Sequence, residues 1–227
     1  MAFDFSSLNP AQAEAVNALD GPVLILAGAG TGKTRTVTCR ISHMVERGIA
    51  PENILAVTFT NKAASEMRER VGDMVSKAAG KEITVCTFHS LCVRILRTGI
   101  DRLGYKENFT IYSGNDQTGL IKQIIIRKGG AQEKIEPGMV LSIISKAKNA
   151  GGDADSIDDP FIADIARAYQ NELRAQNAVD FDDLLLLAER LLREFPDVCE
   201  ICRKRWTRVT VDEFQDTNSL QMRLLQQ

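Results

Sequence analysis

The segment from Ala27 to Thr34 has the residue types and the spacing of a loop that binds phosphate. It departs from the usual G-x-x-x-x-G-K-[ST] pattern only at its first position, where Ala27 replaces glycine. Glycines let the backbone curl until several N–H groups point at one phosphate. Lys33 can then reach the β- and γ-phosphates of a nucleotide, while the Thr34 hydroxyl can bind Mg²⁺. The predicted nucleotide contacts are Gly28, Ala29, Gly30, Thr31, Gly32, Lys33 and Thr34.

Two adjacent carboxylates, Asp212 and Glu213, form a second group with chemical potential. They follow an apolar run at 209–211, and ligands bind at the carboxyl ends of strands in open α/β sheets. Asp212 can hold Mg²⁺ through water, and Glu213 can orient and deprotonate an attacking water. An Asp-Glu pair by itself is usually a solvated turn, but together with the phosphate loop it predicts hydrolysis of ATP with Mg²⁺. Lys33 and Glu213 are then the catalytic candidates, and Thr34 and Asp212 the metal ligands.

The elements around these groups predict an α/β fold. A continuous apolar run at 23–27 is typical of a strand buried on both faces of a parallel sheet. A helical pattern follows the glycine-rich loop from Lys33 to about Arg47. Strand, loop and helix in this order begin an α/β unit. Before them, Asn9 and Pro10 have the residue types of a helix start, which predicts a helix over 11–19.

The same alternation continues and is then interrupted. Further strands are predicted at 54–59, 83–86 and 207–211, and further helices at 61–75 and 89–103. Between Gly114 and about Ala178 only helical patterns occur, separated by glycine-rich turns. An all-helical subdomain inserted into an α/β domain explains this change of pattern. The predicted divisions are 1–110 for the first part of the α/β domain, 111–178 for the insertion and 179–227 for the return.

Composition limits the other classes of protein. The chain has 227 residues, 44% of them hydrophobic and 26% charged, which suits a folded globular protein. A net charge of −2 does not by itself indicate a nucleic-acid-binding protein. Five cysteines, an odd number, suit reduced thiols better than a disulfide framework. The apolar runs are too short to span a bilayer, and the N-terminus lacks the features of a signal peptide. We therefore expect a cytoplasmic protein without membrane association.

Several motifs occur in an order that resembles the UvrD/Rep family of superfamily 1 DNA helicases. Ala27 is normal at its position in that family, so the departure from the general loop pattern supports the resemblance. A segment at 180–184 also resembles the family's return from its helical insertion. The matching motifs are Leu8-Asn9-Pro10-Ala11-Gln12, the loop Ala27 to Thr34, Thr58-Phe59-Thr60-Asn61-Lys62-Ala63-Ala64, Thr87-Phe88-His89-Ser90-Leu91 and Asp212-Glu213-Phe214-Gln215-Asp216-Thr217-Asn218.

The resemblance implies roles for matching residues. Gln12 would recognise adenine through its amide, and Arg35 would lie near the base or sugar. Phe59 and Asn61 would line the path of single-stranded DNA, where a base can stack on the Phe59 ring. His89, at the head of its helix, would touch the DNA. Without the flanking motifs, Gln12 would be interpreted as a surface residue, Phe59 as core and His89 as a histidine satisfied within the fold.

The resemblance also implies the activity and its context. It indicates an ATP-dependent DNA helicase of 3′→5′ type, with a RecA-like P-loop NTPase fold, that uses ATP and Mg²⁺. The expected partners are single-stranded DNA, junctions of single- and double-stranded DNA, and proteins of DNA repair or replication. Family helicases have a second motor domain, whose motifs do not occur here. We therefore expect an N-terminal fragment, comprising motor domain 1A and the helical domain 1B, that needs the missing C-terminal motor domain in cis.

Two other hypotheses remain open from the sequence. One is a nucleotide- or single-strand-binding module without motor activity. The other is an unrelated P-loop NTPase, such as a transporter ATPase or a small GTPase. The sequence contains neither an LSGGQ-like transporter signature nor the NKxD segment that reads guanine, because the aspartate is missing from Asn61-Lys62-Ala63-Ala64.

Overall fold

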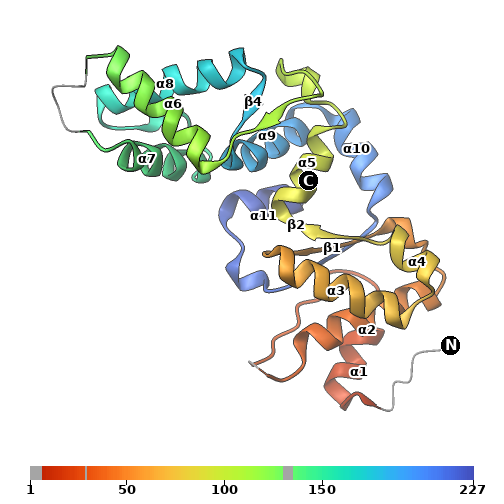
Figure 1. The fold of residues 1–227 in the computed structure, drawn as a ribbon. Coiled ribbons are helices and arrows are strands. Elements are labelled where there is room, and N and C mark those ends of the chain that lie inside the picture. Colours follow the sequence, from red (N-terminus) through yellow and green to blue (C-terminus); the bar gives the residue numbers. More distant parts are fainter. Residues whose placement is uncertain (1–6, 29, 130–134) are drawn as a thin grey trace. The chain divides into compact units, whose positions relative to one another are not determined.

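The computed structural model describes residues 7–28, 30–129 and 135–227 (Figure 1). The described chain forms two compact units. The first comprises Met1–Leu91 and Ile201–Asp216, and the second comprises Cys92–Glu200 and Thr217–Gln227. Helices α5 (Phe88–Leu96) and α10 (Pro196–Arg205) contribute residues to both units.

The first unit contains a parallel sheet of three strands in the order β2–β1–β5. Register pairs Thr58 of β1 with Thr87 of β2, and Val57 of β1 with Val211 of β5. The three strands therefore end at one edge of the sheet. The elements of this unit, besides parts of α5 and α10, are α1 (Pro10–Asn17), α2 (Lys33–Glu46), η2 (Pro51–Asn53), β1 (Ile54–Thr58), α3 (Asn61–Met74), α4 (Lys77–Glu82), β2 (Thr84–Thr87), β5 (Arg208–Val211) and η5 (Phe214–Asp216).

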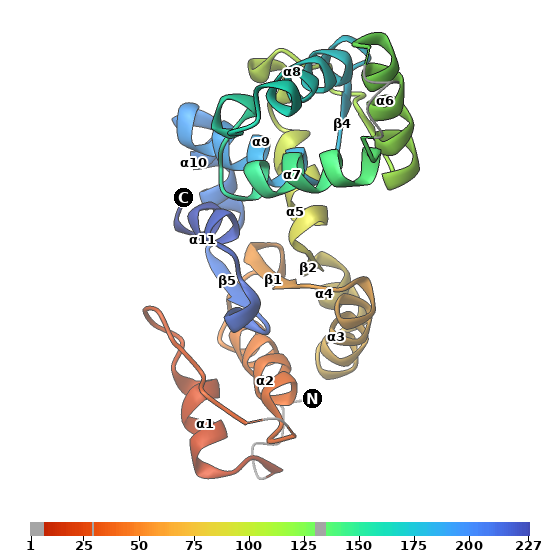
Figure 2. The same ribbon diagram turned by 90° about the vertical axis from the view of Figure 1, so that its left-hand side faces the viewer.

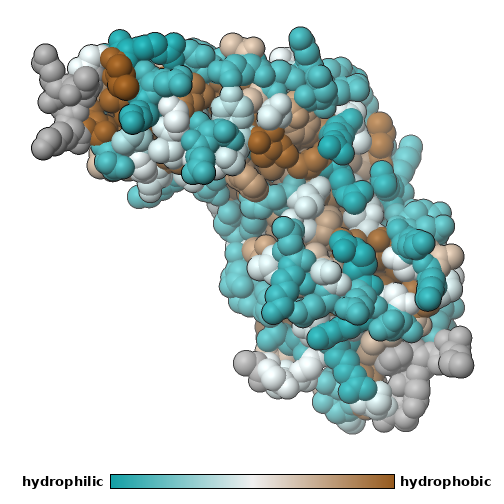
Figure 3. Space-filling view, viewed as in Figure 1, coloured by the Kyte–Doolittle hydropathy of each residue, from teal (hydrophilic) through white to brown (hydrophobic). Residues whose placement is uncertain are grey.

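Helices α2 and α3 cover one face of this sheet (Figure 1). The strands supply apolar side chains at alternate positions, such as Ile54 and Ala56 of β1, because successive residues of a strand point to opposite faces. Ile41 of α2 and Met67 of α3 pack in the same cluster and are almost fully buried. The outer face of α3 carries mainly hydrophilic side chains (Figure 3).

Most predicted elements of this unit are confirmed. The strands predicted near 54–59, 83–86 and 207–211 are β1, β2 and β5, and the helices predicted at 33–47 and 61–75 are α2 and α3. The predicted helix start at Asn9 is also confirmed. The Asn9 side chain accepts a hydrogen bond from the Gln12 N–H at 2.9 Å, and the Gln12 side chain accepts one from the Asn9 N–H at 3.0 Å.

The prediction of a buried strand at 23–27 is wrong. The segment is extended but has no regular structure, and Leu24 and Leu26 are 66% and 86% exposed. Within the described residues, β5 pairs only with β1, and Figure 2 shows the segment as a loop apart from β5. An apolar run becomes a strand only where its backbone groups pair with a neighbouring edge. This segment lacks such pairing, so its composition alone did not decide its structure.

The second unit is mainly helical and has its own core. Side chains of α6, α7 and α8, with Tyr169 and Leu173 fully buried, make one apolar cluster. Besides parts of α5 and α10, the elements are η3 (Ile100–Leu103), β3 (Thr110–Ile111), α6 (Gly114–Arg127), α7 (Pro137–Asn149), η4 (Ala154–Ser156), α8 (Pro160–Ala175), β4 (Ala178–Val179), α9 (Phe181–Glu194) and α11 (Ser219–Gln226).

Two details of this unit differ from the sequence-based expectation. The insertion is not entirely helical, because β3 and β4 form a short parallel pair. Strands of two residues are too short to show a period in the sequence. The helix predicted over 89–103 is divided, since α5 ends at Leu96 and η3 begins at Ile100. Gly99 lies between them, and a β-carbon there would stand 3.1 Å from the Val198 side chain.

The compact units also have bounds different from the predicted segments. The second unit includes 92–110, 179–200 and 217–227 in addition to the predicted insertion. Helix α9 packs against α7, η3 and α11, which explains why these segments join the helical unit. The assignment of the units to domains 1A and 1B stays a prediction.

A buried ion cluster joins α7 to the start of α9. The Lys148 ammonium lies 2.7 Å from a carboxylate oxygen of Asp180 and 2.7 Å from one of Asp183. Lys148 is 6% exposed and both carboxylates are 1% exposed. Burial disfavours the charged amine, but the two carboxylates outweigh it and raise the pKa of Lys148. The Tyr169 hydroxyl donates a further hydrogen bond to Asp180 at 3.0 Å.

No helix in the described ranges has the length and apolar content needed to cross a bilayer.

Replacing Lys148 with methionine should destabilise the second unit by about 3–5 kcal/mol, because two buried carboxylates lose their cation. Lys128→Met is the matched control, since Lys128 pairs with a half-exposed Asp164 and such pairs contribute about 0–1 kcal/mol. Hydrogen–deuterium exchange should show faster exchange in α7, α8 and α9 of Lys148→Met only. Equal protection in the two variants would show that the buried cluster does not stabilise the unit.

Candidate functional site

The candidate phosphate-binding loop, Ala27 to Thr34, needs glycine at two described positions. Gly30 and Gly32 have φ of +76° and +89°, a region that other residues rarely adopt. A β-carbon on Gly32 would also stand 3.1 Å from the Gln12 side-chain nitrogen. Gly32 precedes α2, whose N-terminal N–H groups are available to an anion. The predicted contact Ala29 lies outside the described residues.

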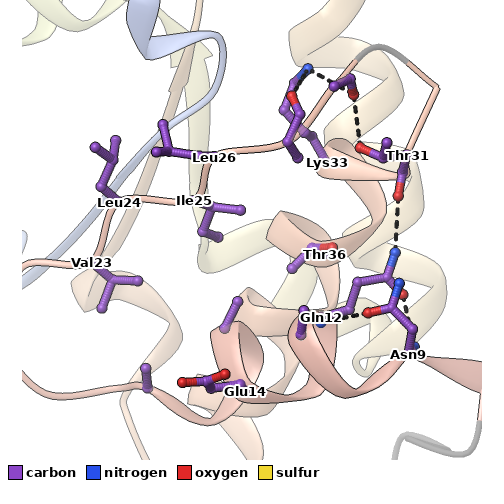
Figure 4. A pocket seen from close by; sticks show the side chains of 15 residues that line it. Asn9, Gln12, Glu14, Val23, Leu24, Ile25, Leu26, Thr31, Lys33 and Thr36 are labelled. Atoms are coloured by element: carbon purple, nitrogen blue, oxygen red, sulfur yellow. Dashed lines mark hydrogen bonds between the residues drawn. The ribbon is translucent and has the colours of Figure 1, made fainter.

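Lys33 is held against the carbonyls at the start of the loop. Its ammonium donates a hydrogen bond to the carbonyl of Ala27 at 3.1 Å and to that of Gly28 at 3.5 Å. The Thr31 hydroxyl also donates to the Gly28 carbonyl, at 2.7 Å (Figure 4). The lysine charge is thus stabilised by carbonyl dipoles, which a phosphate can replace with a stronger, charge-assisted contact.

Gln12 borders the same loop from α1. Its side-chain nitrogen donates to the Thr31 carbonyl at 3.0 Å, while its side-chain oxygen caps α1 (Figure 4). Gln12, Gly28, Thr31 and Lys33 all line a cavity of about 550 Å³. Its other lining residues come from α1 and its two cap residues, from α2 and from the segment 23–27. The structure therefore brings Gln12 to the loop, while its recognition of adenine stays a prediction.

A second cavity is lined both by a residue of the loop and by the two carboxylates. It has a volume of about 280 Å³ and contains Thr34 from α2, Phe59 from the end of β1, and both Asp212 and Glu213. Asp212 extends the sheet, since its N–H donates to the Val57 carbonyl at 2.9 Å. The residues that line this cavity are Thr34, Thr58, Phe59, Thr60, Ala63, Glu66, Arg70, Asp212, Glu213 and Asp216.

Burial and charge act together on the Asp212 carboxyl, which is 6% exposed. Burial raises its pKa most, and the neighbouring Glu213 carboxylate raises it further. A backbone hydrogen bond from Glu213 and the positive charge of Lys33 act in the opposite direction, but the pKa remains above its ordinary value. The positive charge of Lys33 thus acts on the Asp212 carboxyl, so the loop and the carboxylates interact electrostatically.

Glu213 has a strained backbone. Its φ is +52°, which is uncommon for a residue other than glycine and costs of the order of 1–3 kcal/mol. The Gln215 side chain donates a hydrogen bond to the Glu213 carboxylate at 2.7 Å. Such strain is often found at functional sites, where surrounding contacts maintain it. Here the turn allows two consecutive residues, Asp212 and Glu213, to line the same cavity.

Five of the predicted residues that the structure describes do not line either cavity: Gly30, Gly32, Arg35, Asn61 and His89. Arg35 is exposed on α2 and lies beside the Cys39 thiol; burial raises the pKa of this thiol although Arg35 opposes the shift. Asn61 is exposed at the first position of α3. His89 lies in the first turn of α5, partly buried.

The sequence-based prediction missed Glu66 and Arg70, which line the second cavity from α3. Arg70 brings a positive charge to a cavity lined by several carboxylates. A spacing signal was available, because Ala63, Glu66 and Arg70 follow the i, i+3, i+7 pattern of one helix face. This pattern places the three residues on one face of α3 but does not show that the face borders the loop.

The fold and this site agree with a match over almost the whole chain. Residues 8–227 match the family model described as UvrD/REP helicase N-terminal domain. The chain belongs to the UvrD/REP helicase N-terminal domain family.

Similar proteins of this family are found in several bacteria. The ATP-dependent DNA helicase PcrA of Bacillus subtilis is 44% identical over 98% of this chain. The proteins of the same name in Staphylococcus aureus (strain Mu50) and Staphylococcus epidermidis are 42% and 40% identical over 96% of it. In each case the chain spans 31% of the relative's length.

Membership of the UvrD/REP helicase N-terminal domain family argues against the transporter and GTPase hypotheses. The site also fits the cofactors expected from the motifs. Thr34 and Asp212 contribute a hydroxyl and a carboxylate to one cavity, and Mg²⁺ in nucleotide sites is bound by one or two such oxygens together with phosphates. The described residues contain no group of three or more acidic, histidine or cysteine side chains that could hold a metal alone.

The Asp212 carboxyl should titrate above the usual value of about 3.9 for aspartate. Glu213→Gln should lower this pKa, since it removes a neighbouring negative charge, and Lys33→Met should raise it, since it removes a positive one. Carboxyl carbon NMR of the apo protein measures both shifts. Asp73→Asn, an exposed change on α3 away from the cavity, is the control. Shifts of the opposite sign would contradict this arrangement of charges.

Proposed function

We propose that this chain is the N-terminal, ATP- and single-strand-binding part of a cytoplasmic ATP-dependent DNA helicase. Its relatives carry the name ATP-dependent DNA helicase PcrA. In the proposed protein, ATP hydrolysis at the loop and carboxylates drives movement along single-stranded DNA, and we infer a 3′→5′ polarity from the family alone. Junctions of single- and double-stranded DNA, and proteins of DNA repair or replication, are the proposed partners. A C-terminal motor domain acting in cis belongs to the same proposal.

The observation that supports this proposal best is the second cavity. It is lined by Thr34 of the phosphate-binding loop, by Asp212 and Glu213, and by Phe59 of the proposed DNA path. The residues proposed for nucleotide chemistry and for base stacking therefore line one cavity, as expected of a motor that couples the two events.

Each residue has a proposed role that follows from its chemistry. Lys33 contacts the β- and γ-phosphates, and the N-terminus of α2 adds its dipole. Thr34 and Asp212 hold Mg²⁺, which when bound neutralises phosphate charge. Glu213 orients the attacking water and accepts its proton. Arg70 supplies a further positive charge toward the same cavity.

The remaining site residues have roles inferred from the family. Gln12 reads the adenine edge, and Arg35 contacts the base or sugar. Gly28, Ala29, Gly30, Thr31 and Gly32 form the phosphate cradle. On the DNA side Phe59 stacks on a base, and Asn61 and His89 contact the strand.

Lys33→Ala should weaken binding of ATP with Mg²⁺ by at least about 1.5–3 kcal/mol, because a charge-assisted contact to phosphate is lost. Isothermal titration calorimetry measures the affinity. Lys81→Ala removes an exposed lysine of α4 that lines neither cavity and should bind like the wild type. Equal affinity of wild type and Lys33→Ala would show that the nucleotide site is elsewhere.

Phe59→Ala should weaken binding of single-stranded DNA by about 1–3 kcal/mol through lost stacking and leave ATP affinity unchanged. Fluorescence anisotropy with a labelled oligonucleotide at two salt concentrations measures the effect. Wild-type binding should weaken with salt, although the net charge of −2 limits this dependence. Phe181→Ala, an exposed phenylalanine of the other unit, is the control. If Phe59→Ala binds DNA like the wild type, the DNA path does not use this ring.

A further inference from the structure

Two phenylalanines leave the sheet side by side. Thr58 of β1 and Thr87 of β2 form the last pair of the parallel register, so Phe59 and Phe88 are the next residues on adjacent strands. Their ring centroids are 5.4 Å apart and the ring planes are inclined by 55°. This is a favourable arrangement for two aromatic rings.

The two rings have different surroundings. Phe88 is 1% exposed, and it does not line either cavity. Phe59 is only partly buried and lines the 280 Å³ cavity. Phe59 therefore contacts a fixed ring in the core on one side while another part of it faces the cavity.

The backbone around Phe88 is fixed by its neighbours. Phe88 is the first residue of α5, and the Thr87 hydroxyl accepts a hydrogen bond from the Ser90 N–H at 3.3 Å. The same hydroxyl donates to the Ser90 hydroxyl at 3.0 Å. This cap sets where α5 begins, and with it the direction in which the Phe88 side chain enters the core.

We propose that Phe88 is a positioning residue for single-stranded DNA. It holds the Phe59 ring in the orientation in which its accessible face can stack on a base. A ring that is already ordered loses less conformational freedom on binding, and this preorganisation strengthens the complex. The inference rests on the proposed DNA-binding role of Phe59.

A double-mutant cycle tests the inference in the 227-residue chain. Phe88→Leu should weaken oligonucleotide binding by about two- to tenfold, the range expected when binding has to order one more side chain. In the Phe59→Ala background, the same change should have no further effect on DNA affinity. ATP affinity should be unchanged in every variant. Leu91→Val, a small change at a buried position one turn later in α5, controls for general loosening of the helix and should leave DNA affinity unchanged.

The outcomes separate the inference from the proposed function. If Phe59→Ala has no effect on DNA affinity, the proposed DNA site fails, and the inference with it. If Phe59→Ala weakens binding and Phe88→Leu does not, only the inference is overturned. It is also overturned if Phe88→Leu weakens binding equally in both backgrounds, because Phe88 then acts through the fold and not through Phe59. Phe88→Met, which fills the core without a ring, replaces the leucine variant if that variant does not fold.

Discussion

The parallel register of β1 with β2 and β5 is the constraint on which the candidate site depends. Because Thr58 pairs with Thr87 and Val57 with Val211, the three strands end together. The residues that follow, among them Phe59 and Asp212, therefore leave the sheet at one edge. Phe59 and Asp212 therefore need no long loop to reach the cavity that both line. A shift of one strand by a single residue would turn these side chains to the other face and dismantle the site.

The helical unit is specified by a different interaction. One buried ammonium and two buried carboxylates lie between α7 and α9, an arrangement that often gives no more stability than an apolar core. Such a cluster tolerates few alternative packings, since each shift of a helix leaves a charge unpaired. Asn149, the next residue after Lys148, extends the polar contacts to Asp182 at 2.7 Å and toward Asn218 at 3.4 Å. Asn218 caps α11, so these polar contacts reach the start of that helix.

The sequence predicted what is encoded locally and failed where distant partners decide. The helix starts at Asn9 and Lys33 and the three sheet strands follow from caps and apolar runs, and the structure confirms them. The run at 23–27 has the composition of a strand, but composition cannot supply the neighbouring edge that a strand must pair with. Arg70 and Phe88 were missed for a related reason. Their relevance arises from contacts across elements, with a cavity in one case and with the Phe59 ring in the other.

The shared cavity gives the proposed coupling of ATP and DNA a short physical path. Glu213 holds a backbone conformation that is costly for a glutamate, and Gln215 braces its carboxylate. Surrounding contacts maintain a strained turn of this kind, so a new charge at the loop that alters those contacts can shift it. Asp212 already responds electrostatically to Lys33, and Phe59 lines the same cavity as Asp212. A nucleotide that changes the position of either carboxylate therefore changes the surroundings of Phe59 directly. Coupling between ATP and DNA then requires only that this one cavity changes shape. It does not require a series of side-chain movements through the core.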